Sequence, residues 1–130
     1  MMRCAVAATL AHGAERFGII GFVDASRARQ RRVLQAMGVE ERLSGWEPLN
    51  LPMETLTDPA APRDRIAHAA RALAAGGAEA IVLGCAGLAG HAAAAEDAAG
   101  VPVVEPCRAA GAMALLAVIG NAGPQAAGAA

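Results

Sequence analysis

Large aromatic side chains are nearly absent from this sequence, which has two Phe, one Trp and no Tyr in 130 residues. Its core must therefore be built from Ala, Val, Ile and Leu, which favour close packing of helices on a sheet although each residue buries little area. An excess of charge of either sign is absent too, because the formal net charge is −1. That balance provides no electrostatic basis for binding nucleic acid, so we expect no such partner.

Long hydrophobic runs and paired cysteines are also missing. No apolar run approaches the roughly 20 residues that span a bilayer, so we expect no membrane segment. The three cysteines, Cys4, Cys85 and Cys107, form no CxxC pair, and Cys and His do not have zinc-site spacing. We therefore expect reduced thiols, no metal site and a cytoplasmic location.

Hydrophobic residues make up 55% of the chain and charged residues 18%, a balance typical of one folded domain. Apolar runs alternate with segments of helical periodicity that end at glycines, while Pro48 indicates an edge strand. The final ten residues, 121–130, show no periodicity and are expected to form a disordered tail. We predict strands at 17–23, 46–51, 80–85 and 101–105, and helices at 2–12, 26–37, 63–75, 88–99 and 106–119.

Continuous apolar strands between helices indicate a parallel sheet that is covered on both faces. We predict an α/β fold, a flavodoxin-like three-layer sandwich with four parallel strands in the order 2-1-3-4 and helices on both faces. Ligands of such sheets bind beyond the carboxyl ends of the strands, near the point where the first and third strands meet. The loops that follow these strands carry Asp24–Ser26 and Cys85–Leu88. Asp24 and Ser26 are candidate helix caps or ligand contacts.

The segment 79–91 is the most informative part of the chain. An apolar run ends at Gly84, Cys85 follows, and a turn of small residues then opens the predicted helix. Unpaired N–H groups at a helix start favour a thiolate or a bound anion, which suits a sulfur that acts as base or nucleophile. The alternative interpretation of Cys85 is a small buried hydrophobic residue at a strand end.

Two stretches carry a resemblance to a known family: Gly77-Ala-Glu-Ala-Ile-Val-Leu-Gly-Cys-Ala-Gly-Leu-Ala-Gly90 and Gly100-Val-Pro-Val-Val-Glu-Pro106. Together with Arg16-Phe-Gly-Ile-Ile20 and the helix before it, they resemble the second lobe of the aspartate/glutamate racemase superfamily. The resemblance spans roughly residues 3–120, and residues 1–120 would form a single racemase-like lobe. Ala86 follows the cysteine, as in the hydantoin racemase branch that includes allantoin racemases, whereas members acting on aspartate or glutamate usually have Thr there.

The resemblance implies a mechanism without a cofactor. In that family two lobes face each other across a cleft, and each contributes a cysteine. One thiolate removes the proton of the α-carbon and the other thiol returns a proton from the opposite face. Cys85 would be the second-lobe acid/base, and the N–H groups of Ala86 and Gly87 would hold a carbonyl oxygen of a hydantoin or related ureide. Glu105 would accept a hydrogen bond from a ureide N–H or from a neighbouring loop; the alternative interpretation is a residue that caps a helix or braces a loop.

The sequence departs from the family in lacking the first lobe and its cysteine. Neither Cys4 nor Cys107 lies in a first-lobe motif; Cys4 is expected to pack in a helix, and Cys107 either starts a helix or lies near Cys85. One hypothesis is a racemase in which two chains pair, so that two copies of Cys85 flank one cleft. The alternative is a non-catalytic truncated lobe or a small-molecule-binding module. A thiol-redox role ranks third because no CxxC partner is present.

Overall fold

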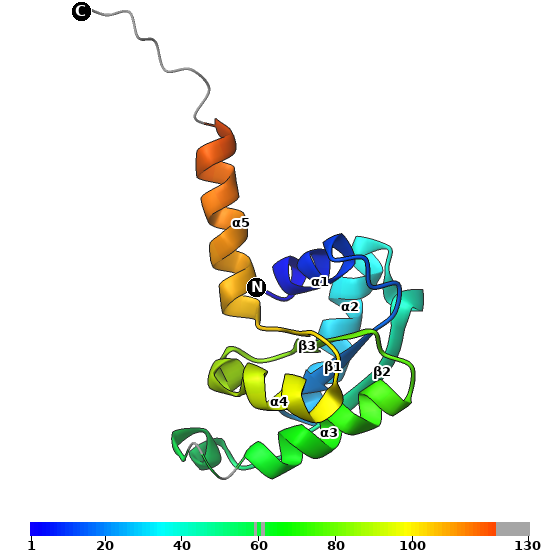
Figure 1. The fold of residues 1–130 in the computed structure, drawn as a ribbon, viewed down its shortest axis with the longest axis vertical. Helices are drawn as coiled ribbons and strands as arrows, with labels where there is room; N and C mark the ends of the chain where they lie inside the picture. Colours follow the sequence, from blue (N-terminus) through cyan, green and yellow to red (C-terminus); the bar gives the residue numbers. More distant parts are fainter. Residues whose placement is uncertain (59, 61, 122–130) are drawn as a thin grey trace, which may run out of the picture.

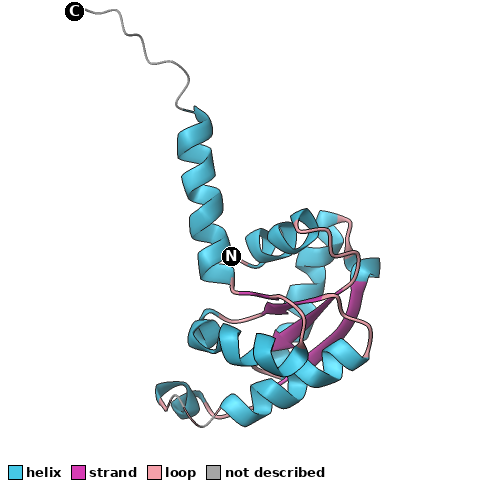
Figure 2. Cartoon of the chain, viewed as in Figure 1, coloured by secondary structure: helices cyan, strands magenta, loops and turns pink. Residues whose placement is uncertain are grey.

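The computed structural model describes residues 1–58, 60 and 62–121 of the chain. Four parallel strands form one sheet in the order β2-β1-β3-β4, as the sequence predicts (Figures 1 and 2). The strands are β1 (Phe17–Gly21), β2 (Leu43–Pro48), β3 (Ala80–Leu83) and β4 (Val103–Val104). The helices are α1 (Met2–Ala11), α2 (Arg27–Met37), α3 (Arg63–Ala75), α4 (Ala92–Ala99) and α5 (Pro106–Asn121). Four short 3-10 segments complete the order: η1 (Asp24–Ser26), η2 (Glu40–Arg42), η3 (Met53–Thr57) and η4 (Ala86–His91).

Helices cover both faces of the sheet, so the molecule has two hydrophobic cores. One core packs α3 and α4 against the sheet, and the other packs α1, α2 and the first turn of α5 against the opposite face. The central strands β1 and β3 are buried along their whole length. Burial on both faces explains why their sequences are continuous apolar runs rather than alternating ones.

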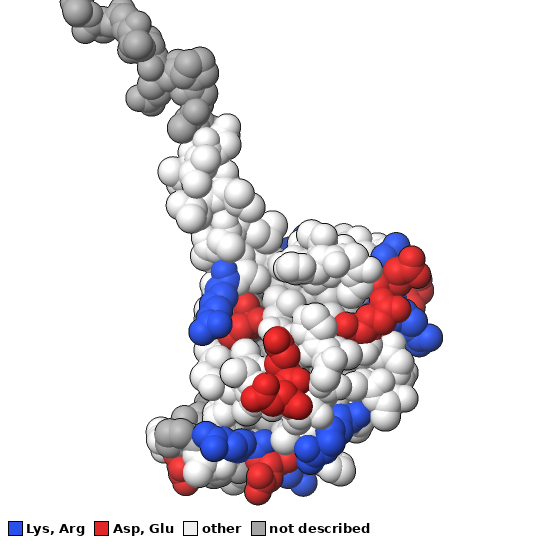
Figure 3. Space-filling model, in the orientation of Figure 1, with Lys and Arg blue, Asp and Glu red and all other residues white. Residues whose placement is uncertain are grey.

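Helix α5 leaves the body of the molecule after its first turns (Figure 1). Its residues 111–120 are all exposed, and among them are the large apolar side chains of Met113, Leu115, Leu116, Val118 and Ile119. The only charged residue of α5 is Arg108 near its start, so the rest of the helix is white in Figure 3. A helix that is apolar on all sides is normally buried, so this surface is unusual.

The boundary predictions were wrong at β2 and after β3. Strand β2 starts at Leu43 rather than Trp46, because a half-buried edge strand accommodates Ser44 and Gly45. A Cβ at Gly45 would lie 2.8 Å from Leu73 Cδ2, so the small residue lets α3 approach the sheet. After β3, the α-helix expected from Leu88 begins at Ala92, since the glycine-rich segment 86–91 forms η4 instead.

The other strands are shorter than predicted: β1 ends at Gly21, β3 at Leu83, and β4 comprises Val103–Val104 alone. The disordered tail predicted at 121–130 lies outside the described residues except for Asn121, the last residue of α5. None of the helices in the described part of the chain is long and apolar enough to cross a membrane.

Candidate functional site

The carboxyl ends of β1 and β3 are adjacent, and Cys85 follows β3 after one residue. Cys85 keeps an extended backbone, with φ −140° and ψ 135°. Side chains alternate along an extended segment, so Ile81, Leu83 and Cys85 face the same side of the sheet. All three contact the core under α3 and α4. Cys85 as a residue is half-buried, and it lies at the predicted edge of the sheet.

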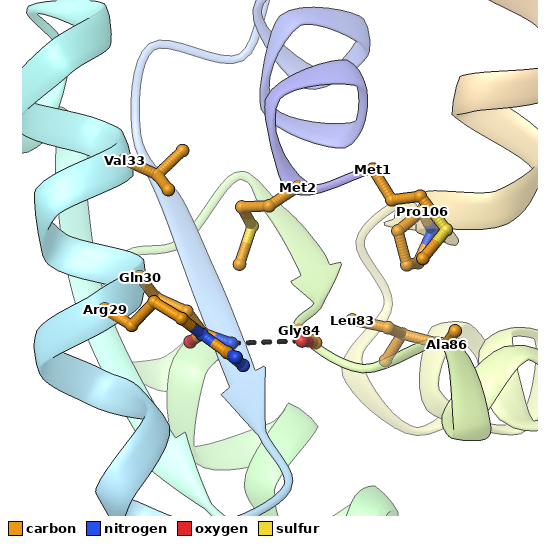
Figure 4. A pocket seen from close by; sticks show the side chains of 9 residues that line it. All are labelled: Met1, Met2, Arg29, Gln30, Val33, Leu83, Gly84, Ala86 and Pro106. Atoms are coloured by element: carbon orange, nitrogen blue, oxygen red, sulfur yellow. Dashed lines mark hydrogen bonds between the residues drawn. The ribbon is translucent and has the colours of Figure 1, made fainter.

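A cavity of about 220 Å³ lies at the same edge, on the side of α1 and α2 (Figure 4). Gly84 and Ala86, the two neighbours of Cys85, contribute to its wall, whereas Cys85 does not. The cavity is lined by Met1, Met2, Arg29, Gln30, Val33, Leu83, Gly84, Ala86 and Pro106.

The N–H groups of Ala86 and Gly87 lie at the start of η4, and both residues are exposed. The first bond of that segment runs from the Leu88 N–H to the Cys85 carbonyl oxygen over 3.1 Å. The N–H groups of Ala86 and Gly87 precede this bond, as is usual at a helix start. The positive end of an α-helix, however, is at Ala92 rather than beside Cys85, because η4 intervenes.

Asp24 and Ser26 lie in η1, after β1, at the same edge of the sheet. The backbone N–H of Asp24 donates to Asn50 Oδ1 over 2.9 Å, and the Ser26 hydroxyl donates to the Val23 carbonyl oxygen over 2.8 Å. Ser26 occupies the N-cap position of α2, as expected for a capping residue, but neither side chain makes a capping hydrogen bond. The Asp24 side chain is exposed at the edge.

Glu105 is 4% exposed and caps the start of α5. One carboxylate oxygen accepts the N–H of Cys107 over 2.7 Å, and the other accepts the N–H of Arg108 over 2.8 Å. Burial acts to raise the pKa of Glu105, but these two backbone hydrogen bonds outweigh it and hold the pKa below its ordinary value. These contacts match the capping role considered for Glu105, and its role as a substrate contact stays a prediction.

Cys107 is exposed at the first turn of α5, with its Sγ 3.6 Å from Met1 Sδ. The Glu105 carboxylate, with smaller effects of burial and of the Cys85 thiol, raises the pKa of Cys107. A raised pKa disfavours the thiolate that would act as base. Cys4 packs against the core under α1 and α2. Among the described residues, no three His, Cys, Asp or Glu side chains group closely enough to hold a metal ion.

A buried polar contact behind Cys85 was missed by the sequence analysis. The Gln30 side chain donates from Nε2 to the Gly84 carbonyl oxygen over 3.0 Å, and its Oε1 accepts the Trp46 indole N–H over 2.6 Å. The available signal was the position of Gln30 four residues before Leu34, which places a polar side chain on the buried face of α2.

Comparison with known proteins places this site in context. The family model described as "Asp/Glu/Hydantoin racemase" matches residues 1–114. An allantoin racemase structure from Klebsiella pneumoniae is similar, with 29% identity, a TM-score of 0.74 and coverage of 90% of this chain and 48% of that one. An allantoin racemase from Pseudomonas fluorescens shares the fold at 24% identity, with a TM-score of 0.77 and coverage of 99% of this chain and 59% of that one.

A structure of unliganded arylmalonate decarboxylase is also similar, with 25% identity, a TM-score of 0.62 and coverage of 96% of this chain and 54% of that one. A search of curated protein sequences found no match. The chain thus spans about half the length of each solved structure named here.

Proposed function

The chain belongs to the Asp/Glu/hydantoin racemase family, and from this premise we propose that it transfers a proton at the α-carbon of a hydantoin or related ureide. Cys85 is the proposed acid/base, and the reaction needs no cofactor. In this proposal residues 1–120 act as one racemase-like lobe. The observation that carries it is a half-buried cysteine at the carboxyl end of a central strand, followed directly by the exposed Ala86 and Gly87.

The proposed reaction exchanges one proton and leaves the substrate's oxidation state unchanged. The Cys85 thiolate takes the proton from the carbon between the carbonyl and the ring nitrogen, so the C–H bond breaks and an S–H bond forms. The electron pair moves to the carbonyl oxygen, where the N–H groups of Ala86 and Gly87 stabilise the enolate. A second thiol returns a proton to the opposite face and completes the inversion.

The second thiol is proposed to be Cys85 of the partner subunit in a two-fold dimer. The apolar surface of α5 supports this idea, because it adjoins a groove of about 400 Å³ between α1 and α5. We call this the α1–α5 groove; it is lined by Ala7, Ala8, Ala11, His12, Ala109, Ala112, Met113 and Leu116. A two-fold interface brings the same patch together from both subunits, and a patch without charged side chains meets its copy without repulsion between like charges.

The remaining site residues take supporting roles in this proposal. Asp24 and Ser26, in the loop after β1, contact the periphery of the substrate. Glu105 holds the first turn of α5, and with it the part of the α1–α5 groove nearest the sheet edge. The free state of all three cysteines supports a reducing, cytoplasmic setting for the reaction.

Deuterium exchange at the α-carbon of a 5-substituted hydantoin, followed by NMR in D₂O, tests the proposal. The native chain is expected to exceed the buffer rate, and Cys85→Ser to lower the enzymatic rate at least ~100-fold, because a serine hydroxyl is a far weaker acid/base near neutral pH. Cys107→Ser is the matched control and should exchange like the native chain. Equal rates for Cys85→Ser and the native chain would contradict the assignment.

The cavity beside Gly84 favours a second candidate function, a lobe that binds a small molecule without reacting with it. Its wall excludes Cys85, so a ligand there would not touch the thiol. Under this alternative, hydantoin perturbs the NMR signals of Gly84 and Ala86 while the native chain exchanges no faster than buffer. The same NMR sample therefore discriminates the two functions.

A further inference from the structure

Gln30 joins three separate elements through its buried side chain. It lies in α2, it accepts the indole N–H of Trp46 in β2, and it donates to the carbonyl oxygen of Gly84 just beyond β3 (Figure 4 shows the second bond). Gln30 is 5% exposed and Trp46 7% exposed. A buried amide whose NH₂ and C=O groups are both paired has one favoured orientation. Flipping the Gln30 amide would place its NH₂ against the Trp46 N–H and its oxygen against the Gly84 carbonyl oxygen.

Two glycines make room for this chain of hydrogen bonds. The Trp46 ring occupies the space that a Cβ at Gly21 would need. A Cβ at Gly84 would lie 2.7 Å from Gln30 Nε2 and 2.9 Å from the Ile20 carbonyl oxygen. Arg27 lies over the Trp46 ring, with its guanidinium carbon 5.4 Å from the ring centroid. The packing therefore leaves the Gln30 amide little freedom.

The hydrogen bond to Gly84 determines how the next residue is oriented. The Gly84 N–H pairs with the Ile20 carbonyl oxygen over 2.8 Å, which is the last ladder contact of this strand end with β1. The Gly84 carbonyl oxygen accepts a hydrogen bond from the Gln30 side chain. Because N–H and C=O point in opposite directions across a trans peptide, a Gly84 carbonyl directed at α2 turns the Cys85 N–H away from α2.

We propose that Gln30 is a positioning residue for Cys85, acting through the Trp46–Gln30–Gly84 hydrogen bonds. This inference rests on the proposed acid/base role of Cys85. Gln30 does not touch the reacting atoms; it holds the peptide between Gly84 and Cys85, so that the thiol and the N–H groups of Ala86 and Gly87 keep one arrangement. Preorganisation of this kind lowers the barrier of the chemical step and leaves substrate binding nearly unchanged.

The first test measures iodoacetamide alkylation of each cysteine by peptide mass spectrometry. Gln30→Leu removes both hydrogen bonds, so the Cys85 segment opens more often, and its alkylation relative to Cys107 should rise about five- to tenfold. Gln35→Leu is the matched control, since Gln35 is exposed on the same helix. Equal Cys85-to-Cys107 ratios in the two folded variants would overturn the proposal.

Gln30→Glu provides a pH-dependent rescue of the two hydrogen bonds. An ionised carboxylate cannot donate to Gly84, but a protonated one can donate to Gly84 and still accept from Trp46. Burial raises the pKa of such a carboxyl, so it becomes protonated as the pH is lowered from about 8 to about 5. The Cys85-to-Cys107 alkylation ratio of Gln30→Glu, compared with that of the native chain at the same pH, should therefore approach the native ratio in acid. If the Cys85-to-Cys107 ratio of Gln30→Glu differs from that of the native chain by the same factor at every pH, the proposal is contradicted.

Trp46→Phe removes only the indole N–H and serves if Gln30→Leu fails to fold. It should also raise Cys85 alkylation relative to Cys107, by a smaller factor. In the exchange assay, Gln30→Leu should lower kcat about tenfold with little change in KM; a change confined to KM would count against positioning. If the native chain exchanges no proton, the proposed function fails, while the alkylation ratios still decide the role of Gln30.

Discussion

At the scale of single residues, Glu105 shows how one carboxylate can begin a helix. Its two oxygens each accept a backbone N–H in the first turn of α5, at distances typical of charge-assisted hydrogen bonds. These N–H groups have no partner within the helix, so the carboxylate satisfies donors that would otherwise be left unpaired. The negative charge also lies at the positive end of the helix.

Glu105→Gln is therefore expected to lower the free energy of unfolding by about 1 kcal/mol at pH 7, the usual cost of losing a cap. The pKa of Glu105 is lowered in the folded state, so its contribution is present above the unfolded pKa of about 4.3 and is lost as the pH falls through the folded value. Urea unfolding at several pH values measures this difference, which should shrink in acid.

The exposed Glu41 offers the control, because Glu41→Gln removes the same charge from a side chain on the surface. Its unfolding free energy should match that of the native chain within about 0.5 kcal/mol. A deficit of Glu105→Gln that stays constant down to acidic pH would show that the charge of Glu105 does not contribute.

At the scale of elements, glycines set the ends of α2 and α4. Gly38 and Gly100 both adopt the left-handed conformation, with φ +68° and +69°. The Gly38 N–H donates to the Gln35 carbonyl oxygen and the Val39 N–H to that of Leu34, which closes the last turn of α2. Each helix thus ends where the sequence analysis expected it to end.

Gly38→Ala isolates the cost of this conformation, because a Cβ there would meet no atom within 4 Å. The substitution should lower the free energy of unfolding by about 1–2 kcal/mol through backbone strain alone. Gly38→Asn should cost less, since Asn tolerates the left-handed region better. Thermal and urea unfolding compare the two variants, and an Ala variant as stable as the native chain would refute the explanation.

At the scale of the whole molecule, α5 is the feature that the isolated fold leaves unexplained. Leu116 is 67% exposed and Val118 is 69% exposed, on a helix that carries no charge after Arg108. Contiguous exposed apolar patches of this kind usually mark an interface. The helix starts at the same edge of the sheet as Cys85, so a subunit that covers α5 also approaches the proposed site.

The dimer proposal predicts that the native chain elutes at about twice its mass of 13.0 kDa in size-exclusion chromatography with light scattering. Leu116→Glu places a charge in the α1–α5 groove and should give a folded monomer that no longer inverts the α-carbon, because the second thiol is lost. Arg71→Glu, on an exposed position of α3, should leave the mass unchanged. A native chain that remains monomeric at assay concentration would exclude a site shared between two copies.

Local patterns were sufficient to predict most elements and the strand order of this molecule. Alternating apolar runs and helical segments, with Gly38 and Gly100 as stops, depend on contacts within a few residues. The parallel order 2-1-3-4 followed because buried strands joined by helices have few ways to pack. The same reasoning placed Cys85 at the carboxyl edge of the sheet, where the structure has it.

Only the tertiary structure decided which way the site residues face. The Cys85 thiol turns toward α3 and α4 while its neighbours line a cavity on the other side, and Gln30 meets Gly84 across 54 positions of sequence. Glu105 accepts the N–H groups at the start of α5, and α5 leaves the body of the molecule after its first turns. Periodicity records whether a residue is buried, whereas its partner depends on how distant segments come together when the chain folds.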